Sequence, residues 1–279
     1  MIATVCFNVR VANAIAGIEK NFDQAADVKS LEEEFYGFMG NREFLPNSPT
    51  LMNAGIALGQ LSAWFVIPVE DSIIDIFEAL RNMAVIHQSG GGTGFSFSHL
   101  RPKGDVVRST KGIAYGPVSF MRIFDTATEV IKQGGRRRGA NMGISRADQP
   151  DIMEFVMSKD DKASLQNFHI SLGVTDEFMQ ATSNGETQSL INPHTGKESG
   201  SIRADKLFDE IINQAWRTGD PGMIFLDRIN RDNPTPQLGP IEATNPFSWS
   251  ARQVCHTLFP YLIQILSRSL YQVPQLHQL

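Results

Sequence analysis

The sequence predicts an α/β protein that contains parallel strands, and three observations support this fold class. Segments with helical spacing alternate along the chain with short apolar segments that have the character of strands. Turn-forming glycines and prolines separate most of these segments. Hydrophobic residues make up 42% of the 279 residues, which is enough to bury a sizeable core. Strands that are joined through helices in this way favour a parallel sheet.

The N-terminal part of the chain predicts a helical region followed by a loop. Residues 10 to 40 have helical spacing, and Gly40 and Asn41 are suitable residues to end a helix. Two prolines and several small polar residues then predict an irregular loop, FLPNSPTLMNAG, over residues 44 to 55. The backbone groups of such a loop are free to bind a ligand.

A strand and a helix are expected next. The stretch LSAWFVIPVED, residues 61 to 71, has the pattern of a half-buried strand and contains Trp64. Asp71 and Ser72 are suitable N-caps for the following helix, and the helix dipole also accounts for the acidic Glu70. The face of this helix that is expected to be buried consists of Ile73, Ile76, Phe77, Leu80, Met83, Ala84 and His87.

A second amphipathic helix and several shorter elements follow. Pro117 stands at a natural first position for a helix that ends before a pair of glycines. Its apolar face is expected to consist of Phe120, Ile123, Phe124, Ala127, Val130 and Ile131. The remaining predicted elements are a short helix opened by Pro150 and Asp151, a strand over 165–174, a hairpin turn at 192–197, a helix over 204–219 and a strand over 222–227.

Charge, hydropathy and cysteine usage predict a cytoplasmic protein with no membrane partner and no direct nucleic-acid partner. The net charge of −5 argues against a general binder of nucleic acid or of membrane surfaces. No run approaches the roughly 20 apolar residues that span a bilayer, and the first residues lack a signal-peptide pattern. Cys6 and Cys255 fit neither a disulfide framework nor a zinc site, and the six histidines show no close pairing, so no metal site is predicted.

Two loops carry residues suited to anion binding. Gly90, Gly91, Gly92 and Gly94 lie between a helix and a strand, where bare backbone amides can hold a phosphate, although a tight packed turn explains them equally well. The loop KQGGRRRGANMG, residues 132 to 143, offers arginine forks for phosphate, whereas the alternative is a solvated basic turn at a helix C-terminus. Composition and spacing therefore predict an anion or nucleotide binder without choosing between these readings.

Five long motifs follow one another in a specific order. They are FLPNSPTLMNAG, LSAWFVIPVEDSI, IHQSGGGTGFSFSHLRPKGD, GPVSFMRIFDTATEVIKQGGRRRGANMG and IEATNP. Read together, they resemble the catalytic subunit of ribonucleotide reductase, most closely its adenosylcobalamin-dependent class. The resemblance covers about residues 10 to 246 and is far more specific than any single glycine loop.

This resemblance implies a fold and a reaction. Residues 1–45 would form an N-terminal helical region, 46–246 about the first half of a ten-stranded α/β barrel with its effector loops, and 247–279 a tail outside the family pattern. The family reduces ribonucleotides to deoxyribonucleotides for DNA synthesis by a thiyl-radical mechanism, with adenosylcobalamin as the radical source. Its implied partners are a ribonucleotide substrate, favoured as a diphosphate, a deoxynucleoside triphosphate effector, a thioredoxin-type reductant and, as a further candidate, a second copy of the chain.

The resemblance also assigns roles to individual residues. Positions that contact substrate in the family are occupied by Ser48, Ala63, Gly92 and Asn245, of which Asn245 also belongs to the catalytic finger loop. Positions of the allosteric effector site are occupied by Asp71, Arg101, Lys132, Gln133 and Arg137. The basic loop therefore corresponds to an effector loop, which favours the ligand-binding reading over a solvated turn.

The chain departs from the family at its catalytic cysteines. The motif Leu-Ser-Ala-Cys-Phe has Trp64 in place of a reducing cysteine, and an indole can neither donate a thiol hydrogen nor form a disulfide. The finger-loop motif Asn-Pro-Cys-Gly-Glu has Phe247 at the radical cysteine and Trp249 at the glutamate. The second reducing cysteine would fall at Leu258, three positions after Cys255.

Two further departures affect the interpretation. Tyr115 stands where the family has a small residue. The 34 residues from Pro246 onward contain no Asp, Glu, Lys or Gly, as expected of a different reading frame. We therefore expect an interrupted N-terminal part of the enzyme that is inactive alone. The alternatives are a non-catalytic deoxynucleotide-binding regulatory protein, or an active variant of a sister class whose radical comes from a separate metal subunit.

Overall fold

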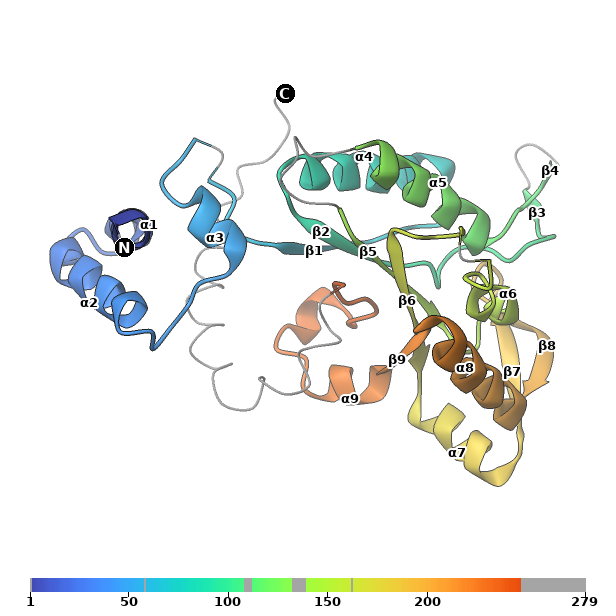
Figure 1. The fold of residues 1–279 in the computed structure, drawn as a ribbon. Helices are drawn as coiled ribbons and strands as arrows, with labels where there is room; N and C mark the ends of the chain where they lie inside the picture. The colour runs from blue at the N-terminus through green and yellow to red at the C-terminus, as the bar shows by residue number, and fades with distance from the viewer. Residues whose placement is uncertain (1, 58, 108–111, 132–138, 162, 247–279) are drawn as a thin grey trace. The chain divides into compact units, whose positions relative to one another are not determined.

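The computed structural model describes residues 2–57, 59–107, 112–131, 139–161 and 163–246, which belong to one unit, Met1–Pro246 (Figure 1). A parallel sheet forms the centre of its larger part, and the first three α-helices form a separate small core. The expected α/β architecture with an N-terminal helical region is confirmed.

The N-terminal region contains more helices than the pattern predicted. Two helices, α1 (Ile2–Ala16) and α2 (Val28–Gly40), replace the single helical segment because the 3₁₀ turn Gly17–Asn21 and the N-cap Asp27 separate them. The predicted irregular loop contains α3 (Ser48–Asn53), in which the Asn47 side chain accepts a hydrogen bond from the Thr50 N–H at 2.9 Å. The residues that predicted a loop thus form an N-cap and a proline-containing first turn. Buried side chains of this region are Val11, Ala12, Met39 and Ala54.

Five parallel strands form the sheet. They are β1 (Trp64–Ile67), β2 (Gly92–Ser96), β5 (Asn141–Arg146), β6 (Phe168–Val174) and β9 (Gly222–Phe225), paired in that order. Every pairing is parallel, and Trp64 of β1 lies opposite Gly92 of β2. The strand predicted over 165–174 is β6, and six of its seven residues are buried because neighbouring strands and packed layers surround it.

Helices and short connections join the strands. The helices are α4 (Ile73–Gln88), α5 (Pro117–Val130), α6 (Ile152–Val156), α7 (Asp176–Asn184), α8 (Ala204–Thr218) and α9 (Leu226–Arg231). The two antiparallel pairs are β3 (Val106–Val107) with β4 (Gly112–Ile113), and the hairpin β7 (Thr187–Asn192) with β8 (Lys197–Arg203), which confirms the predicted hairpin turn. A 3₁₀ turn, Pro236–Leu238, follows α9.

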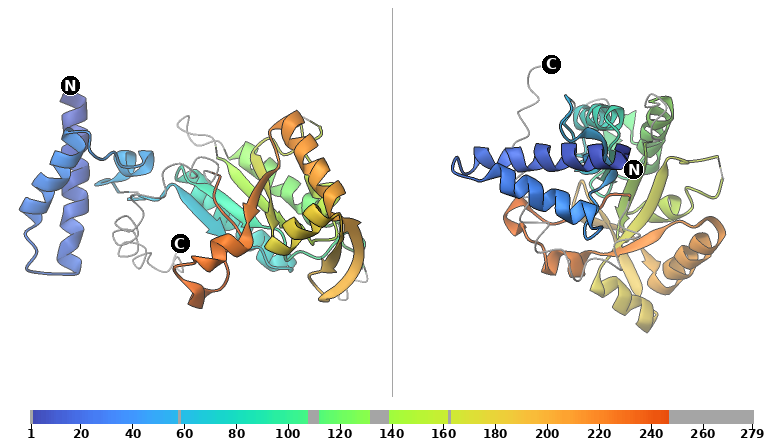
Figure 2. Two further views of the ribbon diagram at one scale, coloured as in Figure 1. Left: turned by 90° about the horizontal axis from the view of Figure 1, so that it is seen from below. Right: turned by 60° about the vertical axis from the view of Figure 1, so that its left-hand side comes forward.

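The sheet has an outer and an inner face, which can be followed in Figures 1 and 2. Helices α4 and α5 cover the outer face, where buried rings of β2, α5 and β6 pack together, such as Phe95 on Phe124 with centroids 4.9 Å apart. The segment after α9 lies on the inner face, where Ala243 packs on Met142 and Ile144 of β5. The large core therefore lies between the sheet and the helices, and the inner face carries smaller contacts.

The buried faces of α4 and α5 differ from those predicted. In α4 the buried residues are Ile76, Ala79, Met83 and His87, whereas Ile73 and Phe77 are exposed. In α5 they are Pro117, Val118, Met121, Phe124 and Thr128, whereas Ile123 and Val130 are exposed. Each helix has apolar residues around more than one face, so helical spacing alone could not decide which face meets the sheet. No helix within the described residues is long and apolar enough to cross a membrane.

Candidate nucleotide-binding site

An ion pair at the start of α4 joins two residues that the sequence assigned to an effector site. The guanidinium of Arg101 contacts both carboxylate oxygens of Asp71, with Nε at 2.9 Å from Oδ2 and Nη2 at 2.8 Å from the same atom. The backbone N–H of Arg101 also donates to Asp71 Oδ1 at 3.1 Å. Both side chains are about four-fifths buried. Of the two predicted N-caps, Ser72 caps α4, because its side chain accepts from the Asp75 N–H, whereas the Asp71 carboxylate accepts from Arg101.

The β7–β8 hairpin adds polar groups to this ion pair. Nδ1 of His194 lies 3.3 Å from Asp71 Oδ2, and the Asn192 amide donates to Asp105 Oδ2 at 3.1 Å. The Asn192 hydrogen bond is the main cause that lowers the pKa of Asp105, and the Asp71 hydrogen bond raises the pKa of Arg101. Three segments distant in sequence therefore form one polar cluster. The sequence analysis did not predict that the β7–β8 hairpin contributes residues to it.

The sequence-predicted substrate positions Ala63 and Gly92 lie at adjoining strand ends. The Gly92 N–H donates to the Ala63 carbonyl at 2.8 Å, and both residues are buried. A Cβ atom on Gly92 would lie 2.5 Å from Cε3 of Trp64, so the indole ring lies directly against this glycine. Only a residue without a side chain fits beneath the ring.

Asn245 follows a segment that crosses β2 on the inner face. A Cβ atom on Gly94 would lie 2.8 Å from the carbonyl carbon of Thr244 and 3.3 Å from Cα of Asn245. The backbone of residues 244 and 245 therefore rests on Gly94 of β2. Gly92 and Gly94 alternate with Thr93 and Phe95 along the strand, so the two glycines face the same side as this segment.

Ser48 is exposed at the first position of α3. Its helix is fixed to the chain before β1, because Thr50 Oγ1 donates to the Leu61 carbonyl at 3.2 Å and the Asn53 amide donates to the Gln60 carbonyl at 2.9 Å. Tyr115 is 75% exposed just before α5. The other residues named from the sequence, Lys132, Gln133, Arg137, Phe247, Trp249, Cys255 and Leu258, lie outside the residues that the structure describes.

A buried polar network that the sequence did not reveal connects α4, β2, β5 and α5. His87 Nε2 is 3.0 Å from Thr93 Oγ1, which donates to Asn141 Oδ1 at 2.7 Å, and the Asn141 amide donates to Thr128 Oγ1 at 2.8 Å. Burial lowers the pKa of His87 to about 4, so this ring is neutral at pH 7. A Cβ atom on Gly139 would lie 2.7 Å from His87 Nδ1, so the network borders the end of the basic loop. The signal in the sequence that could have predicted this network is a polar residue in each of two buried strands, Thr93 in β2 and Asn141 in β5.

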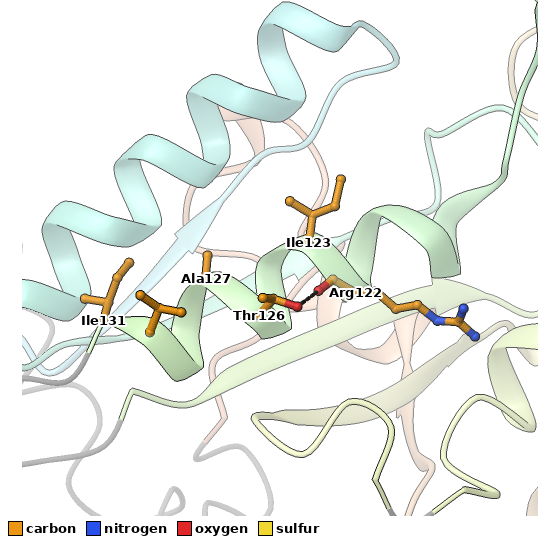
Figure 3. A pocket seen from close by; sticks show the side chains of 6 residues that line it. Arg122, Ile123, Thr126, Ala127 and Ile131 are labelled. Carbon is orange, nitrogen blue, oxygen red and sulfur yellow. Dashed lines mark hydrogen bonds between the residues drawn. The ribbon is translucent and has the colours of Figure 1, made fainter.

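An apolar surface lies on the outer side of α4 and α5. Its most exposed members are Ile73, Ile74 and Phe77 of α4 and Val130 of α5. Figure 3 shows the adjoining shallow hollow, which Ile123, Ala127, Val130 and Ile131 line together with Arg122 and Thr126. Among the described residues, no group of three or more His, Cys, Asp or Glu side chains is placed to hold a metal ion.

A helical region followed by a five-stranded parallel sheet, with α4 and α5 on one of its faces, defines a mixed α/β protein. The comparisons give the family. Residues 62–248 match "Ribonucleotide reductase, barrel domain" and residues 5–59 match "Ribonucleotide reductase, all-alpha domain". The chain belongs to the ribonucleotide reductase family.

Individual relatives carry related names. The chain is 62% identical over 213 residues to a vitamin B12-dependent ribonucleoside-diphosphate reductase of Thermoplasma acidophilum, covering 76% of this chain and 28% of that protein. It is 48% identical to one of Mycobacterium tuberculosis, covering 85% and 34%. A ribonucleoside-diphosphate reductase large subunit of Arabidopsis thaliana is 33% identical, covering 75% and 29%. The chain thus spans about a third of the length of these curated relatives.

Proposed function

We propose that this chain carries the effector-binding part of a cobalamin-dependent ribonucleoside-diphosphate reductase and, as it stands, binds nucleotide without reducing it. The observation that carries the proposal is the Asp71–Arg101 pair at the start of α4, joined by the tip of the β7–β8 hairpin. The vitamin B12-dependent names of two relatives support the class. We further propose that the whole enzyme is cytoplasmic and that it is under allosteric control.

The effector site suits a deoxynucleoside triphosphate. Arg101 presents a planar fork for phosphate oxygens, and the Asp71 carboxylate can accept a hydrogen bond from a ribose hydroxyl. These two groups compensate each other's charge. A bound triphosphate would take over part of the arginine's donors and leave the carboxylate for the sugar. Lys132, Gln133 and Arg137 are proposed to complete the site from the basic loop.

The proposed substrate site keeps the residues that would contact a ribonucleotide, but it lacks the reducing thiol at position 64. Ser48, Ala63, Gly92 and Asn245 are proposed to contact the ribonucleotide, and Gly92 on the glycine surface of β2 has no side chain of its own to keep a ligand away from the backbone. The Trp64 ring lies on that surface at Gly92, where it takes up space that a ribose would need. The same residue therefore removes a reducing group and obstructs the proposed substrate position.

The described residues do not supply the groups that the complete reduction of a ribonucleotide requires. Removing the 2′-hydroxyl as water while two thiols become a disulfide requires two cysteines at the substrate, and position 64 offers an indole. Adenosylcobalamin supplies the radical when it is bound, but no thiol stands at the described substrate positions to receive it. A turnover assay with adenosylcobalamin, ribonucleoside diphosphate and a dithiol or thioredoxin should therefore give no deoxynucleotide above background. Product above background would contradict this interpretation.

Effector binding is tested by calorimetry with dTTP and dATP on the 279-residue chain. We expect saturable binding that Arg101→Ala weakens at least tenfold and Arg137→Ala also weakens. Arg203→Ala is the matched control, because Arg203 forms a similar ion pair with Asp205, at 2.8 Å, on the far side of the hairpin. Folded protein that binds neither nucleotide, or equal losses in Arg101→Ala and the control, would refute the effector site.

The apolar surface on α4 and α5 supports a homodimer through these helices. Ile74 is 81% exposed on α4 and Val130 is 75% exposed on α5, and exposed apolar side chains that gather on neighbouring helices are typical of protein interfaces. Sedimentation velocity should show dimer in the parent chain and monomer in Ile74→Lys with Val130→Lys. Trp216→Lys, at an 85% exposed position on α8, should leave the dimer intact. A monomeric parent chain would exclude the homodimer.

We also propose the domain limits 1–45, 46–246 and 247–279, and a shifted reading frame as the origin of the last of these. Resequencing the coding DNA tests the frame. An alternative frame after codon 246 that encodes Cys-Gly-Glu would support it, and the absence of such a frame would exclude it.

A further inference from the structure

We propose that Asn230 and His99 are positioning residues that seat residues 241–244 on the inner face of the sheet and thereby fix the place of Asn245. The functional meaning of Asn245 rests on the function proposed above, whereas the seat itself does not. Residues 241 to 244 lie outside the strands of the described sheet. The side chains of Asn230 and His99, from elsewhere in the fold, contact the first two of these residues.

Asn230 holds the first residue of this segment by both of its backbone groups. The Ile241 N–H donates to Asn230 Oδ1 at 2.6 Å, and the Asn230 amide donates to the Ile241 carbonyl at 3.0 Å. The same amide donates to the Leu226 carbonyl at 2.9 Å, which fixes the side chain on α9. One asparagine thus replaces a strand neighbour, because its donor and acceptor match those of a backbone peptide.

His99 holds the second residue by its side chain. His99 follows β2, and its Nε2 lies 2.5 Å from Glu242 Oε2, although 143 residues separate the two in sequence. The other ring nitrogen, Nδ1, lies 3.6 Å from Glu70 Oε2. The imidazole therefore stands between two carboxylates and joins the segment to the end of β2 and to the loop before α4.

The third and fourth residues rest on the sheet itself. Ala243 is 8% exposed and packs on Met142 and Ile144. The Thr244 carbonyl lies against Gly94 so closely that no side chain fits between them. Four consecutive residues are thus held by a peptide-like clamp, a charged pair, an apolar contact and a glycine surface. A shift by one residue would break all four contacts, so the register of Asn245 is determined.

The charges around the pair define its dependence on pH. Carboxylates Glu242 and Glu70 face the imidazole, and Arg146, itself paired with Asp148 at 2.6 Å, attracts Glu242. Asp227 adds a weaker attraction on Arg146. The Glu242 hydrogen bond raises the pKa of His99, and the His99 hydrogen bond lowers the pKa of Glu242. The charged pair is therefore complete just below the unfolded pKa of His99, about 6.5, and is lost as pH rises through the raised pKa of His99.

Hydrogen exchange followed by mass spectrometry tests the seat on the 279-residue chain. The informative peptide runs from Gly239 to Pro246, and its exchanging amides are those of residues 241 to 245, because prolines flank them. We expect Asn230→Ala and His99→Gln each to speed exchange of this peptide roughly five- to tenfold, as loss of a hydrogen bond at this site would. Peptides from β6 should not change. Asn184→Ala and His169→Gln, at exposed positions on α7 and β6, are the matched controls.

A pH series separates positioning from a general loss of structure. After correction for the intrinsic exchange rate, the parent peptide should lose protection as pH rises from 6 to 9. His99→Arg should keep its protection at pH 9, because arginine stays charged. Unchanged exchange in both His99→Gln and Asn230→Ala, or a parent peptide without this pH dependence, would overturn the proposal. These outcomes do not involve nucleotide, so failure of effector binding would leave the seat standing.

Discussion

Adding one methyl group to the inner face of β2 should displace the segment that leads to Asn245. Gly94→Ala places a Cβ atom 2.8 Å from the Thr244 carbonyl carbon and closer still to its oxygen. Contacts of a Cβ atom below 3.0 Å essentially never occur, so the backbone of Thr244 must move. Gly94 itself sits in a regular strand without a positive φ, and thus the substitution does not strain its own conformation.

The expected size of the effect follows from the geometry. The carbonyl must withdraw by roughly 1 Å, which is enough to break most of its van der Waals contact with the strand. Overpacking of this kind costs about 1–3 kcal/mol when the surroundings cannot relax. The segment lies outside the strands of the described sheet, so we expect it to move before the sheet does. For a unit of this size, 1 kcal/mol corresponds to about 2–4 °C in Tm.

The assay combines calorimetry with hydrogen exchange. Gly94→Ala should lower Tm by a few degrees and speed exchange in the peptide 239–246, while peptides of β5 and β6 keep their protection. Gly200→Ala on β8 is the matched control, because a Cβ atom there meets nothing within 4 Å. If Gly94→Ala behaves like Gly200→Ala in both measurements, the segment does not lie on Gly94 and the reasoning is refuted.

Three further predictions concern buried polar groups. Thr93→Val should reduce the free energy of unfolding in urea by about 1–3 kcal/mol, since His87 and Asn141 lose a partner, and an unchanged value would contradict the network. The pKa of His87 is lowered to about 4, so the contribution of His87 to stability should be constant above the unfolded pKa of 6.5 and should fall between pH 6.5 and about 4, by at most about 1.4 kcal/mol per pH unit. His87→Gln should flatten that slope, and an identical slope would refute a buried neutral ring. Asp71→Asn should cost about 1–3 kcal/mol in the same assay, because Arg101 loses its charged partner, and no loss would argue against the pair.

Local signals were sufficient for the parts of the fold that neighbouring residues decide. Ser72 caps α4 and Pro117 opens α5 as predicted, because capping and the fixed φ of proline act within one turn. The hairpin turn at 192–197 and the alternation of strands and helices were equally readable. The motif order also identified the family, which the matches to its all-alpha and barrel domains confirm.

Features that depend on which element packs against a residue could not be predicted from the sequence. Both faces of α4 carry apolar side chains, and only the position of the sheet decided that Met83 is buried and Ile74 exposed. The 44–55 segment contains loop-forming residues that become a capped helix where α3 packs on its neighbours. The roles assigned to the effector and substrate residues stay predictions until binding is measured.

Trp64 shows which properties of the protein follow from its sequence and which follow only from its tertiary structure. The sequence by itself determined that the chain belongs to an α/β family of nucleotide reductases and that an indole stands where its reaction needs a thiol, because residue identity is a chemical property of one position. Only the tertiary structure decided that this indole covers Gly92, that Asp71 meets Arg101 and His194, and that Asn230 and His99 hold the approach to Asn245. Those contacts join residues up to 143 positions apart, and the folding of the sheet alone brings them together.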